Sequence, residues 1–218
     1  EKAENVTENG GENTQEKRYF AKVLWGGLLK SRKSAALPGA KIYPPTLTNS
    51  DLANIKIAKE MGVTGVMQPF VRDHSDLECV KEALREAGAE DIRLFAKIEN
   101  MDGVRKLEKL LPAADEIVIA RGDLGNAVHL WDLPGVQRQI SEKCRAAGKP
   151  FMVVTQMLAS MERSPVPTRA EVNDIFHAVM DGAASIMVTG ETAVGDYPVE
   201  VIRYMVNTVR SAEKEENR

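Results

Sequence analysis

The chain has 218 residues, of which 43% are hydrophobic and 28% charged, and its net charge at pH 7 is -3. This composition is typical of a globular protein with one sizeable core, and it argues against the basic surface of a nucleic-acid-binding or membrane-surface protein. No apolar run is long enough to span a bilayer, and the first residues do not resemble a signal peptide.

The first 40 residues predict little regular structure. Residues 1–18 are polar and include two adjacent glycines, which is typical of a loop or a frayed terminus. Residues 19–25 (YFAKVLW) predict a strand, and residues 26–39 (GGLLKSRKSAALPG) predict a turn-rich connection.

From residue 46 onwards, the pattern alternates between helix and strand. A helix is predicted over 48–62, with Thr48 or Ser50 as its N-cap and Gly62 as its stop signal. Five short apolar strands follow, each with a helix after it, as expected for parallel strands that helices cover. The strands are predicted at 63–70, 92–100, 116–123, 150–157 and 184–191, and the helices at 74–88, 102–111, 133–148, 168–182 and 198–214.

This alternation predicts an α/β fold with a parallel sheet. A (β/α)8 barrel needs eight such units and about 250 residues. Because only five units are present, the pattern predicts either a partial (β/α)8 TIM barrel made of the last five βα units or an open sheet of similar rhythm.

Polar residues gather where the five strands end. The pairs and triplets concerned are Gln68–Pro69, Lys97 with Glu99, Arg121–Gly122–Asp123, Thr155–Gln156 and Thr189–Gly190–Glu191. In barrels and open α/β sheets alike, active sites form at the carboxyl ends of the strands. We therefore expect a functional site at this edge of the sheet.

Lys97 and Glu99 stand two residues apart at the end of one predicted strand. Because side chains alternate with period 2, both point to the same face, and the apolar residues between and before them point to the helices. We expect Lys97 and Glu99 to face the mouth of the site. The alternative is a purely structural Lys–Glu pair at a strand terminus.

The segment ARGDLG, residues 120–125, predicts a tight turn after the next strand. Gly122 would let a ligand approach the backbone, and free N–H groups at such a turn bind carboxylate or phosphate. Asp123 could join Glu99 in holding a divalent cation, since two carboxylates plus substrate oxygens suit Mg²⁺ or Mn²⁺. The alternative for Asp123 is a helix N-cap.

Thr155 places a hydroxyl at the following strand end, where it could bind or protonate a substrate or simply support the structure. A lysine, a carboxylate-bound cation and backbone N–H donors all stabilise a concentrated negative charge. Phosphoryl transfer and enolate chemistry both require this, so the residues indicate an enzyme for a small anionic substrate without choosing the reaction.

Over residues 19–215 the chain resembles the pyruvate kinase family. The matching segments, in the order and spacing of the family, are GGLLKSRKSAALPG, PFVR, KIEN, ARGDLG, AGKP, TQMLASM, PTRAEVND, DGAASIM and GETAVGDYPVE. The resemblance implies a (β/α)8 barrel with a small β lid inserted after its third strand. Residues 1–40 would be a remnant of this lid domain with its hinge, and residues 41–218 the C-terminal part of the barrel.

The resemblance implies transfer of the phosphoryl group of phosphoenolpyruvate to ADP, giving pyruvate and ATP. Lys97 would stabilise charge on the phosphoryl group and the enolate, and Glu99 and Asp123 would hold Mg²⁺ or Mn²⁺. Backbone N–H groups of Gly122 and Asp123 would bind the substrate carboxylate, and Thr155 would line the pocket where the enolate is protonated. A homo-oligomer in the cytoplasm, without nucleic-acid or membrane partners, is also expected.

The departures from the family concern what precedes this region. In the family, the first three barrel strands carry an arginine near the phosphoryl group, the K⁺ ligands and part of the nucleotide site. None of these residues can be assigned in this chain. With Glu at position 1 as well, we expect a fragment of a longer chain that has negligible activity alone.

The alternative is an inactive paralogue or binding module that retains the metal and phosphoenolpyruvate half-site. The motifs count against a third candidate, an enolpyruvate-using barrel lyase. Local differences at Gln68–Pro69, Thr189 and Val194 affect the subtype.

Overall fold

A computed structural model describes residues 4–5, 17–18, 22–24, 26–28, 31 and 44–216. The chain divides into two compact units, Glu1–Ala35 and Ala36–Arg218. In the first unit, β1 (Glu4–Asn5) pairs antiparallel with β2 (Lys17–Arg18), a pairing that the sequence did not predict because such short strands show no alternating pattern. Of the strand expected over 19–25, residues 22–24 are described and form no strand; its other residues, and most of the connection over 26–39, lie outside the described residues.

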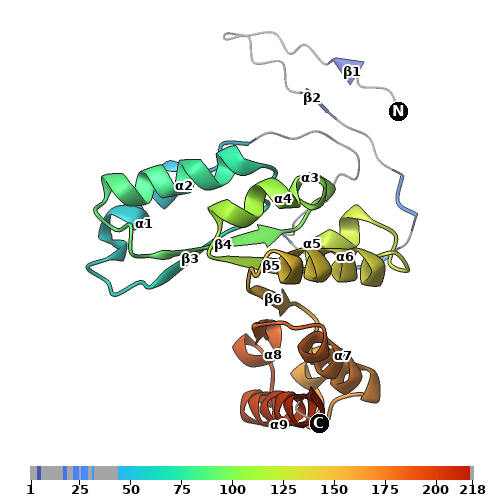
Figure 1. Cartoon of the computed structure of the whole chain (residues 1–218). Helices are drawn as coiled ribbons and strands as arrows, with labels where there is room; N and C mark the ends of the chain where they lie inside the picture. The colour runs from blue at the N-terminus through green and yellow to red at the C-terminus, as the bar shows by residue number, and fades with distance from the viewer. Residues whose placement is uncertain are drawn as a thin grey trace. The chain divides into compact units, whose positions relative to one another are not determined.

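The second unit is built on a parallel sheet of five strands in the order β3-β4-β5-β6-β7 (Figure 1). The strands are β3 (Gly65–Gln68), β4 (Arg93–Ile98), β5 (Glu116–Ala120), β6 (Phe151–Val154) and β7 (Ser185–Met187). Each strand pairs with the next one along the chain. The predicted α/β fold with a parallel sheet is therefore confirmed.

Helices precede the first of these strands and follow each of the five. They are α1 (Asn49–Ala58), α2 (His74–Glu86), α3 (Met101–Arg105), α4 (Leu107–Leu110), α6 (Leu133–Ala146), α7 (Arg169–Met180) and α9 (Pro198–Glu216). The single helix predicted over 102–111 is divided between α3 and α4, because the backbone at Lys106 leaves the helical conformation.

Four short elements were not predicted, since none is long enough to show a helical period. They are α5 (Arg121–Ala127), α8 (Gly190–Ala193) and the 3-10 helices η1 (Leu111–Ala113) and η2 (Ala159–Glu162). Two of them, α5 and α8, begin directly where strand-end motifs were identified. These two strand-end motifs therefore lead into helical turns rather than open loops.

The long helices begin and end where local chemistry dictates. Thr48 caps α1 through a reciprocal capping box with Asp51, and Thr168 caps α7 in the same way with Glu171. The chain leaves α2 through Gly88, whose φ of +64° suits a residue without a side chain. These signals explain the starts of α1 and α7 and the end of α2, whereas α1 ends at Ala58, before the predicted stop at Gly62.

The two faces of the sheet have different surroundings. On one face, Leu94, Ala96 and Ile98 of β4 are buried in the main apolar core together with residues of the helices. On the other, Val118, Ala120 and Val154 form a small separate cluster with half-buried neighbours such as Phe95. Lys97 stands two residues after Phe95 and so shares this second face. The face expected for Lys97 is thereby confirmed.

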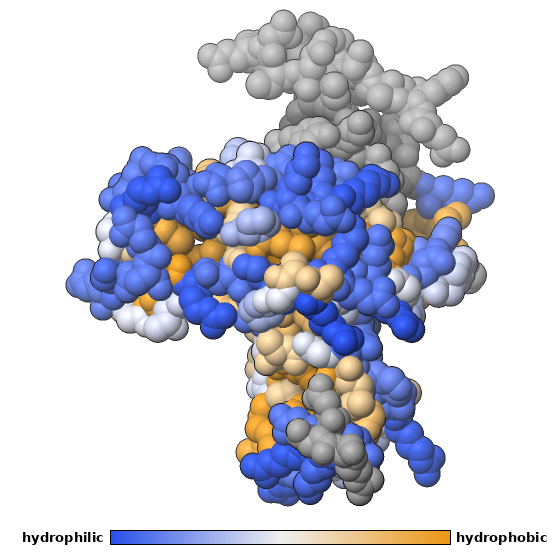
Figure 2. All heavy atoms as spheres, in the orientation of Figure 1, coloured by the Kyte–Doolittle hydropathy of each residue, from blue (hydrophilic) through white to orange (hydrophobic). Residues whose placement is uncertain are grey.

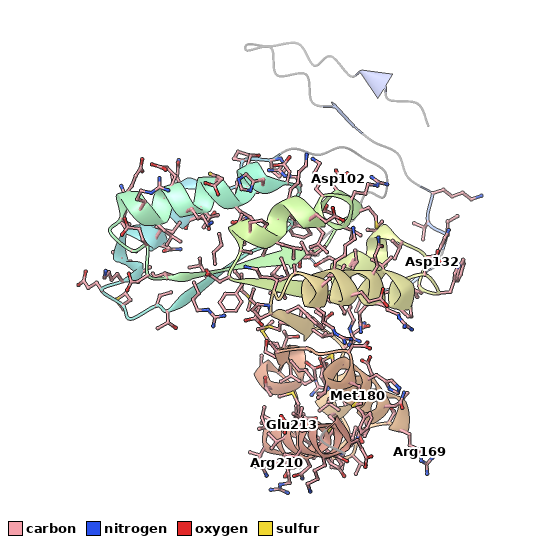
Figure 3. The ribbon with its side chains drawn as sticks, viewed as in Figure 1. Asp102, Asp132, Arg169, Met180, Arg210 and Glu213 are labelled. Carbon is pink, nitrogen blue, oxygen red and sulfur yellow. The ribbon has the colours of Figure 1, made fainter. Side chains whose placement is uncertain are left out.

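The C-terminal helices α7 and α9 lie side by side (Figure 1). Apolar surface is visible over this part of the molecule in Figure 2. The exposed apolar side chains of the C-terminal segment include Val194, Val199, Ile202 and Val206. The side chain of Arg169 extends away from the start of α7, and Arg210 and Glu213 lie on α9 (Figure 3). A cavity of about 490 Å³ is lined by apolar and polar residues from α7 and the segment before it, together with Tyr204 of α9. Among the described residues, none of the helices has the length and apolar character needed to cross a membrane.

Candidate active site

An ion pair stands at the carboxyl end of β4. The Nζ atom of Lys97 lies 2.7 Å from Oε1 of Glu99, and the Lys97 side chain is 25% exposed while that of Glu99 is 2% exposed. The second carboxylate oxygen of Glu99 accepts the backbone N–H of Phe70 at 2.7 Å. A buried carboxylate needs such partners, because an unpaired charge in a low-dielectric setting is costly.

The loop after β3 is fastened to the end of β4. Val71 donates its backbone N–H to the carbonyl of Lys97, and Asn100 donates its side-chain amide to the carbonyl of Val71 at 3.1 Å. Phe70 has a φ of +51°, which is uncommon for a residue with a side chain. The sequence drew attention to Gln68 and Pro69 at this strand end but missed Phe70, because nothing in the residue itself marks a left-handed backbone.

A second buried carboxylate fixes the start of α2. Asp76 accepts hydrogen bonds from the Arg72 guanidinium at 2.6 and 3.0 Å, from the Arg72 backbone N–H at 2.8 Å and from the Thr46 hydroxyl at 2.6 Å. Burial by itself raises the pKa of Asp76, but these hydrogen bonds outweigh it and lower the pKa to about 2. This network anchors the loop that carries Phe70.

Gly122 and Thr155 bind each other across neighbouring strand ends. The backbone N–H of Gly122 donates to Oγ1 of Thr155 at 2.8 Å, and the Thr155 hydroxyl donates to the carbonyl of Val154 at 2.5 Å. The tight turn predicted at ARGD is instead the first turn of α5, whose N–H groups have no partners within the helix. The N–H expected to face a ligand is thus occupied within the chain.

Asp123 is exposed and is the third residue of α5, so it is not the helix N-cap. Ile98 of β4 pairs with Ile119 of β5, and one further step of this register puts Glu99 beside Ala120. Glu99 and Asp123 therefore follow neighbouring strand ends. In the described part of the chain no three His, Cys, Asp or Glu side chains gather closely enough to hold a metal ion. Two carboxylates completed by substrate and water oxygens are nonetheless a donor set that suits Mg²⁺.

Thr155 has a strained backbone and a charged neighbour. Its φ is +74° and that of Gln156 is +55°. The Arg121 side chain is only 10% exposed, and its guanidinium donates to the Thr155 carbonyl at 2.7 Å and contacts Oδ2 of Asp174 at 2.6 Å. Asp174 follows Arg121 by 53 residues, and no sequence pattern connected the two.

The comparisons with known proteins point to a single family. The family model described as "Pyruvate kinase, barrel domain" matches residues 7–202. Proteins named pyruvate kinase from Bacillus licheniformis and Candida albicans are each 40% identical to the chain, over 93% and 91% of its length. Another from Geobacillus stearothermophilus is 42% identical over 84% of the chain. The chain belongs to the pyruvate kinase family.

The chain spans about a third of the length of these three pyruvate kinases. Its match covers 34%, 39% and 31% of them, respectively. The matched region contains all five strands of the parallel sheet and the strand-end motifs that follow them.

In the sequence, Glu191 belongs to a strand-end triplet that predicts no role for its side chain. Glu191 of GETA is 2% exposed, and it accepts the backbone N–H of Leu158 at 3.2 Å and that of Thr189 at 2.8 Å. It therefore connects the end of β7 to the segment after β6. A glutamate beside a glycine at a strand end was the available signal, but its burial could not be predicted from the motif.

Proposed function

We propose that the protein transfers the phosphoryl group of phosphoenolpyruvate to ADP, giving pyruvate and ATP. The observation that carries the proposal is the ion pair of Lys97 and Glu99, which stands at the carboxyl end of β4 within the segment KIEN. A partly exposed cation beside a buried carboxylate at this end of a parallel sheet is the arrangement expected of an active site for an anionic substrate.

We also propose that residues 41–218 are the C-terminal part of a (β/α)8 barrel, in which the sheet supplies the last five strands, and that residues 1–40 are a remnant of a lid domain with its hinge. The sequential strand order of the sheet and the packing of helices on one of its faces support this. A doubly wound sheet reverses its strand order at a switch point and carries helices on both faces.

Lys97 supplies positive charge to the phosphoryl group and to the enolate that forms as the group leaves. Catalysis of phosphoryl transfer consists largely of positioning and charge neutralisation, so one well-placed ammonium contributes directly. Its contact with Glu99 holds the flexible lysine side chain toward the strand ends. Lys97 is therefore oriented before a substrate arrives.

Glu99 and Asp123 are the residues that would hold Mg²⁺ or Mn²⁺. Their carboxylate oxygens suit a hard cation, and the Phe70 N–H keeps the Glu99 carboxylate in place. When bound, the ion supplies Lewis-acid stabilisation of charge on substrate oxygens. A K⁺ requirement is expected from the family, and none of the residues of this chain is assigned to bind that ion.

Gly122 and Asp123 would bind the substrate carboxylate through their backbone N–H groups at the start of α5. For this to happen, the carboxylate must replace the Thr155 hydroxyl as the acceptor of the Gly122 N–H. The exchange releases the hydroxyl, which then lines the pocket where the enolate takes up a proton. Substrate binding and the freeing of Thr155 are thus one event. A homo-oligomer in the cytoplasm is proposed from the family alone.

The proposal is tested by following pyruvate formation from phosphoenolpyruvate and ADP with Mg²⁺ and K⁺, using the protein as its gene encodes it. Lys97→Met should lower kcat by about a hundredfold or more. Lys143→Met is the matched control and should leave kcat unchanged, since Lys143 is 31% exposed and contacts Glu108 at 2.8 Å on the helical side. Folded protein that forms no pyruvate, or a Lys97→Met variant with normal turnover, contradicts the proposal.

One observation favours a second candidate, a binding module without turnover. Both groups proposed to bind the anion already have partners in the chain. Lys97 is paired with Glu99, and the Gly122 N–H donates to Thr155. Such a module would bind phosphoenolpyruvate in a calorimetric titration but release no pyruvate. The same pair of measurements therefore separates the two candidates.

A further inference from the structure

Thr155 is held in a conformation that it would not adopt alone. A β-branched residue at φ +74°, followed by Gln156 at φ +55°, is strained, and such strain persists only where surrounding contacts impose it. Besides the bonds of its hydroxyl to Gly122 and Val154, the contact that restrains the Thr155 backbone is the hydrogen bond from the Arg121 guanidinium to its carbonyl.

Arg121 depends in turn on Asp174. The Arg121 side chain is 10% exposed and its guanidinium is always charged, so its burial requires a carboxylate partner. This carboxylate is that of Asp174 on α7, whose Oδ2 atom lies 2.6 Å from Nη1 of Arg121. The Nη2 atom of Arg121 also contacts Sδ of Met157 at 2.8 Å. Arg121 thus joins the end of β5, the segment after β6 and the helix α7.

From this geometry we propose that Asp174 and Arg121 are positioning residues, which keep Thr155 in its strained conformation so that its hydroxyl stands at the site. Asp174 acts only through Arg121, since it lies on α7 rather than at a strand end. The inference rests on the proposed function for its kinetic consequence, but the conformation of Thr155 can be observed independently of any activity.

The first test is NMR of the protein labelled with ¹³C-threonine, in which the Cα and Cβ shifts of Thr155 report its left-handed backbone. Asp174→Asn should move these shifts toward ordinary values. Asp196→Asn is the matched control, because the pair of Arg163 and Asp196 joins neighbouring segments at 2.8 Å but is exposed. It should leave Thr155 unchanged. Unchanged Thr155 shifts in folded Asp174→Asn overturn the proposal, whatever the activity of the protein.

The second test is a double-mutant cycle on kcat for pyruvate formation. Asp174→Asn should lower kcat about tenfold with little change in KM for ADP, because the lost interaction serves the reaction rather than binding. Combined with Thr155→Val, it should lower kcat no further than Thr155→Val alone, since both changes act on one hydroxyl. If the decreases in kcat of the two single variants instead multiply in the double variant, Asp174 has a merely structural role and the proposal is contradicted.

Two further outcomes are also decisive. If the wild-type protein forms no pyruvate yet the Thr155 shifts move in Asp174→Asn, the proposed function fails and the positioning role stands. If Asp174→Asn does not fold, Asp174→Glu keeps the charge while displacing the carboxylate, and the shifts of Thr155 should then move by a smaller amount. Wild-type shifts in Asp174→Glu, together with wild-type kcat, count against the role.

Discussion

The Nζ atom of Lys97 lies 2.7 Å from Oε1 of Glu99, while Oε2 of the same carboxylate accepts the backbone N–H of Phe70 at 2.7 Å. Two strand ends are thereby joined through one buried carboxylate. Its charge is compensated and its orientation fixed before any ligand binds. A ligand at this position would therefore exchange partners with an ordered group, which reduces the ordering cost of binding.

Removal of the Thr155 hydroxyl should separate turnover from carboxylate binding. In Thr155→Val, the Gly122 N–H loses its acceptor within the chain and stays available to a carboxylate. We expect kcat to fall by about a hundredfold or more, since a positioned acid–base group contributes about 10²–10⁴-fold, while inhibition by the product pyruvate is retained or strengthened.

Steady-state kinetics with pyruvate as inhibitor measure both effects. Thr208→Val serves as the control, because the hydroxyl of this buried threonine donates to the Tyr204 carbonyl within α9, away from the strand ends. It should alter neither constant. Weakened pyruvate inhibition in Thr155→Val would show that the hydroxyl binds the carboxylate directly and would contradict the exchange described above.

Asp76 should make the free energy of unfolding sensitive to acid. Its pKa in the folded protein is lowered to about 2. Because the folded pKa lies below the unfolded value, the stabilisation is complete above about pH 4 and is lost as the pH falls through about 2. At pH 7, Asp76→Asn should lower the free energy of unfolding by about 3 kcal/mol, since it removes the charged acceptor of the hydrogen bonds from Arg72 and Thr46.

Urea unfolding of the wild type and of Asp76→Asn between pH 7 and pH 2 measures this difference. The gap between the two proteins should be constant above about pH 4 and close as the pH approaches 2. The exposed Asp196→Asn provides the comparison and should show no large gap at any pH. A difference between wild type and Asp76→Asn that does not change with pH would contradict the assignment.

The two cysteines should react very differently with thiol reagents. Cys79 is exposed on α2, whereas Cys144 is buried, and burial raises the pKa of its thiol to about 12 despite the nearby Lys149. Because the thiolate is the reactive form, only Cys79 should react with a disulfide reagent at about pH 8. A colorimetric titration should therefore count one thiol per native chain, none in Cys79→Ser, and the second only after unfolding. Rapid reaction of both thiols in native protein would contradict the burial of Cys144.

The alternating elements could be predicted because their signals are local. Thr48 as N-cap, Gly88 as stop and the five apolar strand segments from residue 63 onwards each depend on a few adjacent residues, and the structure places them as expected. The end of α1 at Ala58, before the predicted stop at Gly62, was not foreseen. The face of Lys97 followed from the two-residue period of a strand. The division at Lys106 was missed, because the apolar period continues across it.

The strand-end motifs could be recognised in the sequence, but the contacts around them could not. These motifs place the proposed site at one edge of the sheet, since every parallel strand ends there. The bonds from Phe70 to Glu99 and from Arg121 to Asp174 join distant residues through backbone conformations that no local pattern specifies. The occupation of the Gly122 N–H by Thr155 was unforeseen for the same reason.

The central claim is that the strand ends form a site for a divalent cation and an anionic substrate, with Glu99 as a ligand. The most direct measurement is Mn²⁺ binding followed by electron paramagnetic resonance, with and without phosphoenolpyruvate. The wild-type protein is compared with Glu99→Gln and with the control Glu116→Gln, which changes a buried glutamate paired with Arg93 at the opposite end of the sheet.

We expect the wild type and Glu116→Gln to bind Mn²⁺ more tightly when phosphoenolpyruvate is present, and Glu99→Gln to lose at least about tenfold in affinity. Folded wild-type protein that binds no Mn²⁺, or a Glu99→Gln variant that binds it as the wild type does, would contradict the account.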